Sequence, residues 1–206
     1  LEYASRQALS LVPRVQVENP ELTRGGSTTV TVTAFLGSDA QLDDVHVDLR
    51  VPQGWTAERL EGDEPTAETL AYNETVSAQF TVTVPEDAEL YNPYIRHIHP
   101  FRANTDLAGI VSYEVDGVEV EASVDPYVTV AVVPDISLRV SPSNLVHNVV
   151  KPDQEIVLDV AATNYVDGPT STTLTVDVPE GWAVEPETID IEFAAKGDAT
   201  GASFTI

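Results

Sequence analysis

The chain has 206 residues, which suits one large domain or two ordinary ones, and its 34 acidic and 10 basic residues give a net charge of −24. Such a charge repels nucleic acids and anionic lipid headgroups, so it argues against nucleic-acid binding. The absence of cysteine excludes disulfides and thiolate metal sites, and the sequence has no apolar run of about 18 residues that would insert into a membrane. The acids are spread along the chain, which favours the solvated surface of an exported protein or a salt-rich habitat over a cation-binding surface.

The first 12 residues predict a short helical turn or linker, because their apolar residues fall roughly on one side of a helix. Pro13 is expected to end it, since proline lacks the amide donor that a helix needs. The sequence begins at Leu1 and contains no methionine, so we expect it to be a piece of a longer protein.

Residues 13–133 predict a first β-sandwich domain, because apolar residues recur there at every second position, as in half-buried strands. A turn is expected at 24–27, a polar loop at 37–44 and an acidic loop at 58–68. The alternating sets are Val15 and Val17; Val30, Val32, Ala34 and Leu36; Val45, Val47, Leu49 and Val51; and Val76, Ala78, Phe80, Val82 and Val84.

The end of this domain predicts a hairpin. Strands are expected at 107–115 and 118–124, joined by the pair Asp116-Gly117, which suits a type I′ turn because both central residues need positive φ. A further strand is expected at 127–133. We place the domain boundary at Pro134.

Residues 134–206 predict a second domain with the same order of strands. Its alternating sets are Ile136 to Val140; Ile156, Leu158, Val160 and Ala162; Leu174, Val176 and Val178; Ile189, Ile191 and Phe193; and Ala202, Phe204 and Ile206. The copy stops where the first domain continues with residues 85–133, so we expect a partial, truncated copy.

The repeat is marked by Val51-Pro52-Gln53-Gly54-Trp55, which returns as Val178-Pro179-Glu180-Gly181-Trp182. Aligned on this marker, the preceding strand pair keeps its apolar face inward only if one residue is gained or lost in the intervening loop. The predicted fold class is all-β, with two tandem immunoglobulin-like antiparallel β-sandwiches.

An alternating strand, Val-Pro-x-Gly-Trp, a polar loop and a strand ending in Val84-Pro85 together resemble the NPCBM-associated, or α-galactosidase-associated, immunoglobulin-like domains. The resemblance implies a noncatalytic accessory sandwich of an exported carbohydrate-active enzyme. Tyr91 to Arg96, followed by Asp116-Gly117 and a second Gly-Trp unit, is also similar to the tandem domains behind PIG-L type sugar de-N-acetylases. The zinc motif of that family, Pro-His-x-Asp-Asp, is absent, so no catalytic residue and no cofactor is assigned.

A basic segment interrupts the acidic chain, since residues 93–105 contain no acid. We expect it to dock against a carboxylate-rich neighbour, either the other sandwich or a catalytic domain of the same polypeptide. Pairing of its arginines with local acids is the equal alternative. The interaction residues are Tyr94, Arg96, His97, His99, Phe101 and Arg102.

Other site-like residues have plainer interpretations. Trp55 and Trp182 are expected to cap the cores; stacking on a sugar ring is the alternative. Too few ligands accompany the two histidines of the basic segment to predict a metal site. The acids at 39–44 and 61–64 lack the spacing of a calcium loop, and no nucleophile, carboxylate pair or phosphate loop is evident. No catalytic, metal or cofactor-binding residue is therefore predicted.

The predicted function is a noncatalytic accessory region of a larger carbohydrate-active hydrolase or sugar de-N-acetylase, located outside the cell or at its surface. Its partners would be the catalytic domain of the same polypeptide and a polysaccharide or cell-wall glycan. Two alternatives stay open: a structural or adhesive surface protein of immunoglobulin-like repeats, and a glycan-binding module in its own right.

Overall fold

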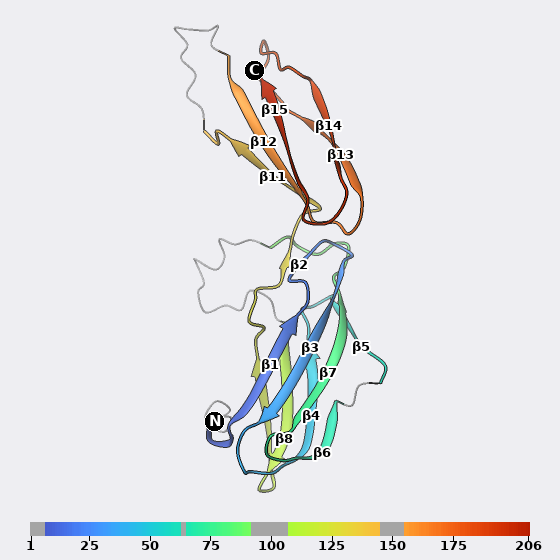
Figure 1. Cartoon of the computed structure of the whole chain (residues 1–206), viewed down its shortest axis with the longest axis vertical. Coiled ribbons are helices and arrows are strands. Elements are labelled where there is room, and N and C mark those ends of the chain that lie inside the picture. Colours follow the sequence, from blue (N-terminus) through green and yellow to red (C-terminus); the bar gives the residue numbers. More distant parts are fainter. Residues whose placement is uncertain (1–6, 63–64, 92–106, 145–154) are drawn as a thin grey trace. The chain divides into compact units, whose positions relative to one another are not determined.

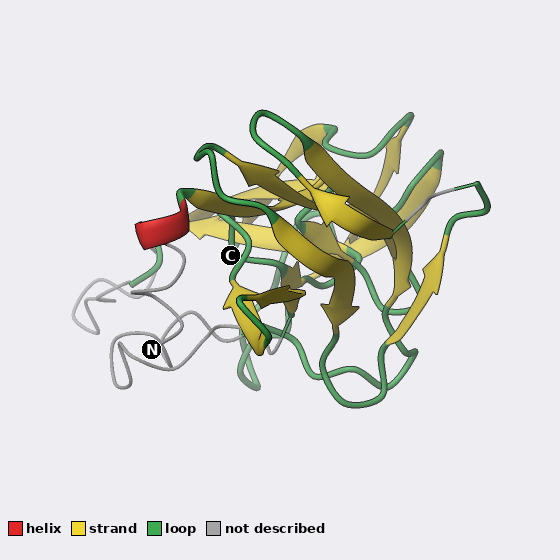
Figure 2. Cartoon of the chain, turned by 90° about the horizontal axis from the view of Figure 1, so that it is seen from below, coloured by secondary structure: helices red, strands yellow, loops and turns green. Residues whose placement is uncertain are grey.

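A computed structural model of the chain describes residues 7–62, 65–91, 107–144 and 155–206 (Figure 1). Strands and loops make up nearly all of this part of the chain, with a single short helical turn near its start (Figure 2). The predicted all-β class is confirmed. The chain divides into two compact units, Leu1–Val132 and Val133–Ile206, and each is described by itself.

Unit 1 consists of two four-stranded antiparallel sheets with the apolar core between them. A parallel pair of two-residue strands, β2 (Glu21–Leu22) and β10 (Ala131–Val132), supplements them. One sheet has the order β1-β3-β7-β5 and contains β1 (Leu11–Val17), β3 (Ser27–Leu36), β7 (Thr75–Thr83) and β5 (Thr56–Arg59). The other has the order β6-β4-β8-β9 and contains β6 (Thr66–Leu70), β4 (Leu42–Arg50), β8 (Ala108–Val115) and β9 (Val118–Val124).

The alternation along β3 places every second side chain in this core, as predicted. Val30, Val32 and Ala34 are each 0% exposed, while the residues between them are only partly buried. The predicted hairpin is also confirmed, since Asp116 and Gly117 between β8 and β9 have φ angles of 51° and 76°.

The helical turn or linker predicted over the first 12 residues is shorter than expected, because β1 already begins at Leu11. Described helical residues are confined to 7–9. Pro13 lies inside β1, opposite Ala34 of β3, and its side chain is buried. Proline is tolerated here because β1 is the edge strand of its sheet.

The polar loop predicted at 37–44 is shorter than expected, because β4 begins at Leu42. Leu42 and Val45 are both 0% exposed although they are three residues apart. The register of β4 against β8 shifts between Asp43 and His46, and Asp44 has a φ of 48°. This β-bulge changes the phase of the strand, which brings Leu42 into the core.

Two other predictions for unit 1 were wrong in part. The acidic loop at 58–68 overlaps two strands, because β5 and β6 pair with the outer edges of β7 and β4. Edge strands with few buried residues lack the alternation of apolar and polar residues that indicates a strand in a sequence. The strand expected at 127–133 is limited to β10, and Tyr127 is 96% exposed.

Unit 2 contains a three-stranded sheet and a two-stranded sheet. The first has the order β11-β12-β15 and contains β11 (Ile136–Ser141), β12 (Val157–Asn164) and β15 (Ala199–Thr205). The second pairs β13 (Thr170–Thr175) with β14 (Thr188–Phe193). The predicted alternation supplies its core, which contains Val160, Ala162, Leu174, Ile191, Phe193 and Phe204.

Five strands of unit 2 repeat five strands of unit 1 in order and pairing: β11, β12, β13, β14 and β15 correspond to β1, β3, β4, β6 and β7. Leu158 lies opposite Phe204 in β15, as Val30 lies opposite Phe80 in β7. The predicted one-residue difference also holds. The bulge near Asp44 lies within the stretch that is one residue longer in unit 1.

Candidate functional site

The repeated Gly-Trp marker forms the same β-turn in both units. The carbonyl oxygen of Pro52 accepts a hydrogen bond of 3.1 Å from the Trp55 amide, and Pro179 accepts one of 3.1 Å from Trp182. Gly54 and Gly181 at the third positions have φ angles of 86° and 88°. Positive φ at the third position is the requirement of a type II turn, which explains the glycine in both copies.

The two tryptophans differ in their surroundings. Trp55 is partly buried and packs against the core of unit 1, which confirms the expected capping role. Trp182 is 41% exposed, so it is less covered than Trp55, and the expected capping role is not confirmed for it. In unit 1, strand β8 begins beside the turn, where Ala108 pairs with Arg50. The described part of unit 2 has no strand in the corresponding place.

The structure contains a second repeated turn, which was not predicted from the sequence. The residues Ala71-Tyr72-Asn73-Glu74 join β6 to β7, and Ala195-Lys196-Gly197-Asp198 lie in the connection from β14 to β15. The Glu74 carboxylate accepts the Ala71 amide at 2.8 Å, and the Asp198 carboxylate accepts the Ala195 amide at 2.8 Å.

The third residue of this turn has positive φ in both copies, 63° at Asn73 and 85° at Gly197. Asparagine and glycine are the residues that adopt this conformation most readily. An alignment of the two repeats would have found the motif if it had looked for two features: Asn or Gly at the third position, and an acidic residue at the fourth.

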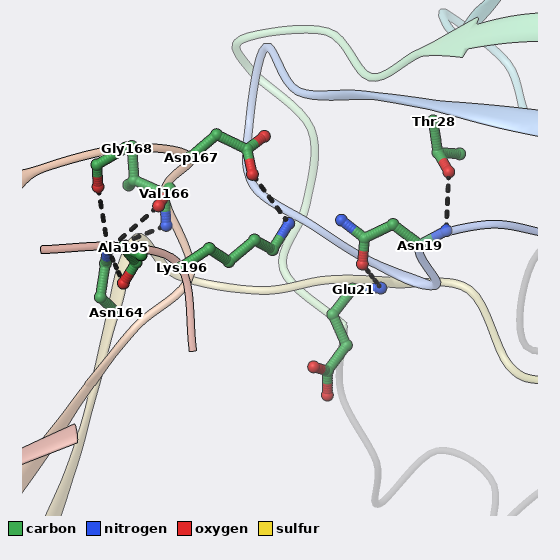
Figure 3. A network of polar contacts seen from close by, with 9 residues as sticks. All are labelled: Asn19, Glu21, Thr28, Asn164, Val166, Asp167, Gly168, Ala195 and Lys196. Carbon is green, nitrogen blue, oxygen red and sulfur yellow. Dashed lines mark hydrogen bonds and ion pairs between the residues drawn. The ribbon is translucent and has the colours of Figure 1, made fainter. Parts of the chain in front are cut away.

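Asn164 organises the polar end of unit 2 and is 0% exposed (Figure 3). Its side-chain amide nitrogen donates to the carbonyl oxygens of Val166 and Ala195 at 3.0 Å each, and its oxygen accepts the Val166 amide at 2.9 Å. The amide therefore joins the loop after β12 to the turn after β14. Nearby, Lys196 lies 3.8 Å from Asp167.

At the start of unit 1, two short polar contacts shape the corner between β1 and β2 (Figure 3). The Asn19 amide donates to Thr28 Oγ1 at 3.0 Å, and Asn19 Oδ1 accepts the Glu21 amide at 3.2 Å. Arg24 Nε donates to the Ala88 carbonyl oxygen at 2.8 Å. Each of these side chains binds backbone or a neighbouring turn, which is a structural role.

The predicted interaction residues Tyr94, Arg96, His97, His99, Phe101 and Arg102 lie outside the described residues. Within the described part of the chain, no group of three His, Asp or Glu side chains is placed to hold a metal ion. Asp39, Asp43 and Asp44, from the expected polar loop, form no such group. No helix of the described chain is long and apolar enough to cross a membrane.

Solved structures with partial likeness come from several kinds of protein. A GH20 exo-β-N-acetylglucosaminidase from Vibrio harveyi is 16% identical with a TM-score of 0.34, over 80% of this chain and 24% of that one. The secreted serine protease VesC from Vibrio cholerae is 12% identical with a TM-score of 0.42, over 98% of this chain and 45% of that one. The sporulation control protein Spo0M from Bacillus subtilis is 10% identical with a TM-score of 0.31, over 89% of this chain and 90% of that one.

The chain thus spans about a quarter of the glucosaminidase chain, at 24%. No curated protein matches the sequence. The family comparison is more specific: residues 22–95 match the NPCBM-associated, NEW3 domain of alpha-galactosidase. This range begins in β2 and contains β3 to β7, including the Trp55 turn and the Glu74 turn. The likeness of this chain to the NPCBM-associated, NEW3 domain family therefore covers residues 22–95.

Proposed function

We propose that the chain is a noncatalytic accessory region of a larger exported carbohydrate-active hydrolase or sugar de-N-acetylase, in which it spaces or orients the catalytic domain. The family match over residues 22–95 is the observation that supports this most directly, because the family is an accessory domain of glycoside hydrolases. The parent enzyme and its substrate class are part of the proposal.

The polar chemistry of the described residues supports a scaffold role. The buried amide of Asn164 and the turn carboxylates of Glu74 and Asp198 all bind backbone groups. Backbone-bound side chains stabilise a turn, and their hydrogen-bonding capacity is then used within the fold. A folded sandwich suits a spacer, because it keeps a more constant length than a flexible linker of the same number of residues.

The partner in this proposal is the catalytic domain of the same polypeptide. The basic segment at 93–105 is its proposed contact. The chain has a net charge of −24, so most of its surface would repel a carboxylate-rich partner, whereas this segment contains no acid. Replacing Arg96 and Arg102 with alanine should then weaken association between the accessory region and the catalytic domain at least fivefold. Unchanged association between the accessory region and the catalytic domain would contradict this proposed contact, but not the accessory role.

The accessory role is tested in the parent enzyme by separating small from polymeric substrates. Deleting residues 1–206 is expected to leave kcat/KM on a small soluble glycoside within about twofold, because the reacting groups lie elsewhere. Turnover of the insoluble polymer, or the thermal stability of the catalytic domain, should fall. A parent polypeptide with no catalytic domain, built only of further Gly-Trp sandwiches, would instead establish the structural or adhesive alternative.

The glycan-binding alternative has its own measurement. In affinity gels that contain soluble polysaccharide, an accessory spacer is expected to migrate as it does in gels without polysaccharide. Retardation that Trp182→Ala removes, and that Trp55→Phe leaves unchanged, would show that the chain binds glycan itself.

A further inference from the structure

Part of the inner face of β11 is exposed in the described part of unit 2, at Leu138 and Val140, whereas Ile136 packs against the core. Leu138 and Val140 lie directly opposite Ala162 and Val160 of β12. Side chains of directly opposed residues project to the same face of an antiparallel pair. Ala162 and Val160 are 0% and 7% exposed, so this is the core face, yet Leu138 and Val140 are 56% and 42% exposed.

The corresponding face of unit 1 is covered. Val15 of β1, the counterpart of Val140, is only 4% exposed. A β-carbon built on Gly109 of β8 would lie 2.5 Å from Val15 Cγ2, so the backbone of β8 rests directly on this side chain. Strand β8 is held there by pairing with β4, and β9 extends the same sheet.

In unit 1, β8 pairs with β4. The described part of unit 2 contains β13, the counterpart of β4, but no counterpart of β8. One edge of β13, the counterpart of β4, pairs with β14. Its other edge has no strand partner among the described residues. An open edge, an uncovered apolar face and the 41% exposure of Trp182 therefore coincide where β8 and β9 lie in unit 1.

We propose that the inner face of β11 and the open edge of β13 form an acceptor for a β-hairpin of the β8–β9 kind, located after β15 in the same polypeptide. Its first strand would pair antiparallel with β13 and present apolar residues at alternate positions to the core. A glycine is required opposite Val140, because a β-carbon on Gly109 of β8 would lie 2.5 Å from Val15 Cγ2.

The order of the strands favours a hairpin in the same polypeptide over a separate partner. In unit 1, β7 ends at Thr83 and β8 begins at Ala108, so the covering strand follows the equivalent of β15 along the chain. A tethered strand acts at an effective concentration of about millimolar, which a separate chain rarely reaches. Each backbone group on the β13 edge also gains a ladder hydrogen bond.

The proposal can be tested by thiol labelling, because the chain has no cysteine of its own. Val140→Cys reports the open face. Val157→Cys, on the outer face of β12 and 53% exposed, is the matched exposed control, and Val15→Cys is the covered one. The labelling rates are measured in the chain as it stands and in a chain extended after Ile206 by a copy of residues 83–124.

In the unextended chain, Val140→Cys should react within about threefold of Val157→Cys and at least tenfold faster than Val15→Cys. The extension should slow Val140→Cys at least tenfold and leave Val157→Cys within twofold. Amide exchange across Thr170–Thr175, measured without any cysteine, should slow at least tenfold as well. This second readout holds if a cysteine variant fails to fold.

An extended chain with unchanged labelling and unchanged exchange would overturn the proposal. Protection of Val140→Cys in the unextended chain that grows with protein concentration would identify a second copy as the occupant, and would overturn it too. Protection that needs added polysaccharide would assign the face to glycan, with the same consequence.

Discussion

Gly109 lies so close to Val15 that a β-carbon placed on the glycine would be 2.5 Å from the valine Cγ2 and 2.9 Å from Val32 Cγ1. Gly109→Ala should therefore lower the free energy of unfolding of unit 1 by about 1–3 kcal/mol, because the added methyl forces the sheets apart. Denaturant titration measures the change. Gly201→Ala is the control, since its nearest heavy atom is 3.9 Å away, and equal effects at both glycines would contradict the packing argument.

Asn164 is expected to be the most costly polar residue of unit 2. Asn164→Leu introduces the residue that unit 1 has at the equivalent position, but leaves the carbonyl oxygens of Val166 and Ala195 without their donor. We expect unit 2 to lose about 2–4 kcal/mol in thermal or denaturant unfolding. Thr173→Ala removes an exposed hydrogen bond to Asp190 and should cost less than about 1 kcal/mol. If both variants cost the same, the network does not stabilise the unit.

The two Gly-Trp turns should respond alike to backbone substitution. Gly54→Ala and Gly181→Ala each place a β-carbon at a φ of 86° or 88°, which costs about 1–2 kcal/mol. Asparagine at either position should recover about half of that loss, because it tolerates positive φ better than alanine. The measurement is the unfolding midpoint of each unit. A neutral alanine variant at either position would contradict the type II turn.

The two tryptophans, in contrast, should respond differently. Trp55→Ala is expected to cost about 2–4 kcal/mol in the unfolding of unit 1, because Trp55 packs against its core. Trp182→Ala should cost less than about 1 kcal/mol, since the side chain is 41% exposed. In the single-tryptophan variants Trp55→Phe and Trp182→Phe, acrylamide should quench Trp182 more strongly than Trp55. Equal quenching would show that both turns have the same surroundings.

Salt should stabilise the chain. With a net charge of −24, the folded units repel themselves, and ions screen this repulsion over a Debye length of about 10 Å at 0.1 M. Raising sodium chloride from about 10 mM to 500 mM should increase Tm by at least about 3 °C. Sodium sulfate also changes hydrophobic burial, so sodium chloride is the cleaner probe. A falling Tm would mean that attractive ion pairs outweigh the repulsion.

The core strands of both units could be predicted from the sequence because their side chains alternate between core and solvent. Val30 and Val32 in β3 and Phe80 in β7 belong to such alternating sets in central strands. The alternation predicts that a strand is present, which of its faces is buried and how it aligns with its neighbours. The edge strands β5 and β6 bury little, so their sequences resemble loops. The bulge near Asp44 was also missed, since one extra residue changes the phase without changing composition.

The polar features were harder to predict for a different reason. Asn164, Glu74 and Asp198 bind backbone groups that the fold brings to them, and such contacts have no sequence period. The exposure of Trp182 depends on a neighbouring strand rather than on its own motif, which shares the Val-Pro-x-Gly-Trp pattern with that of Trp55. A repeated sequence therefore predicts a repeated turn, while its surroundings follow from the whole set of strands.

The last strand of unit 1 has a mechanical consequence. Strand β10 is only two residues long, yet its backbone is held from two directions. The Ala131 amide donates to Pro20 at 2.8 Å, and Val132 accepts the Tyr91 amide at 2.8 Å. Tension on the polypeptide beyond Val132 would load these short hydrogen bonds before it reaches the sheets. We therefore expect these two hydrogen bonds to break before the sheets separate when the chain is pulled at this end.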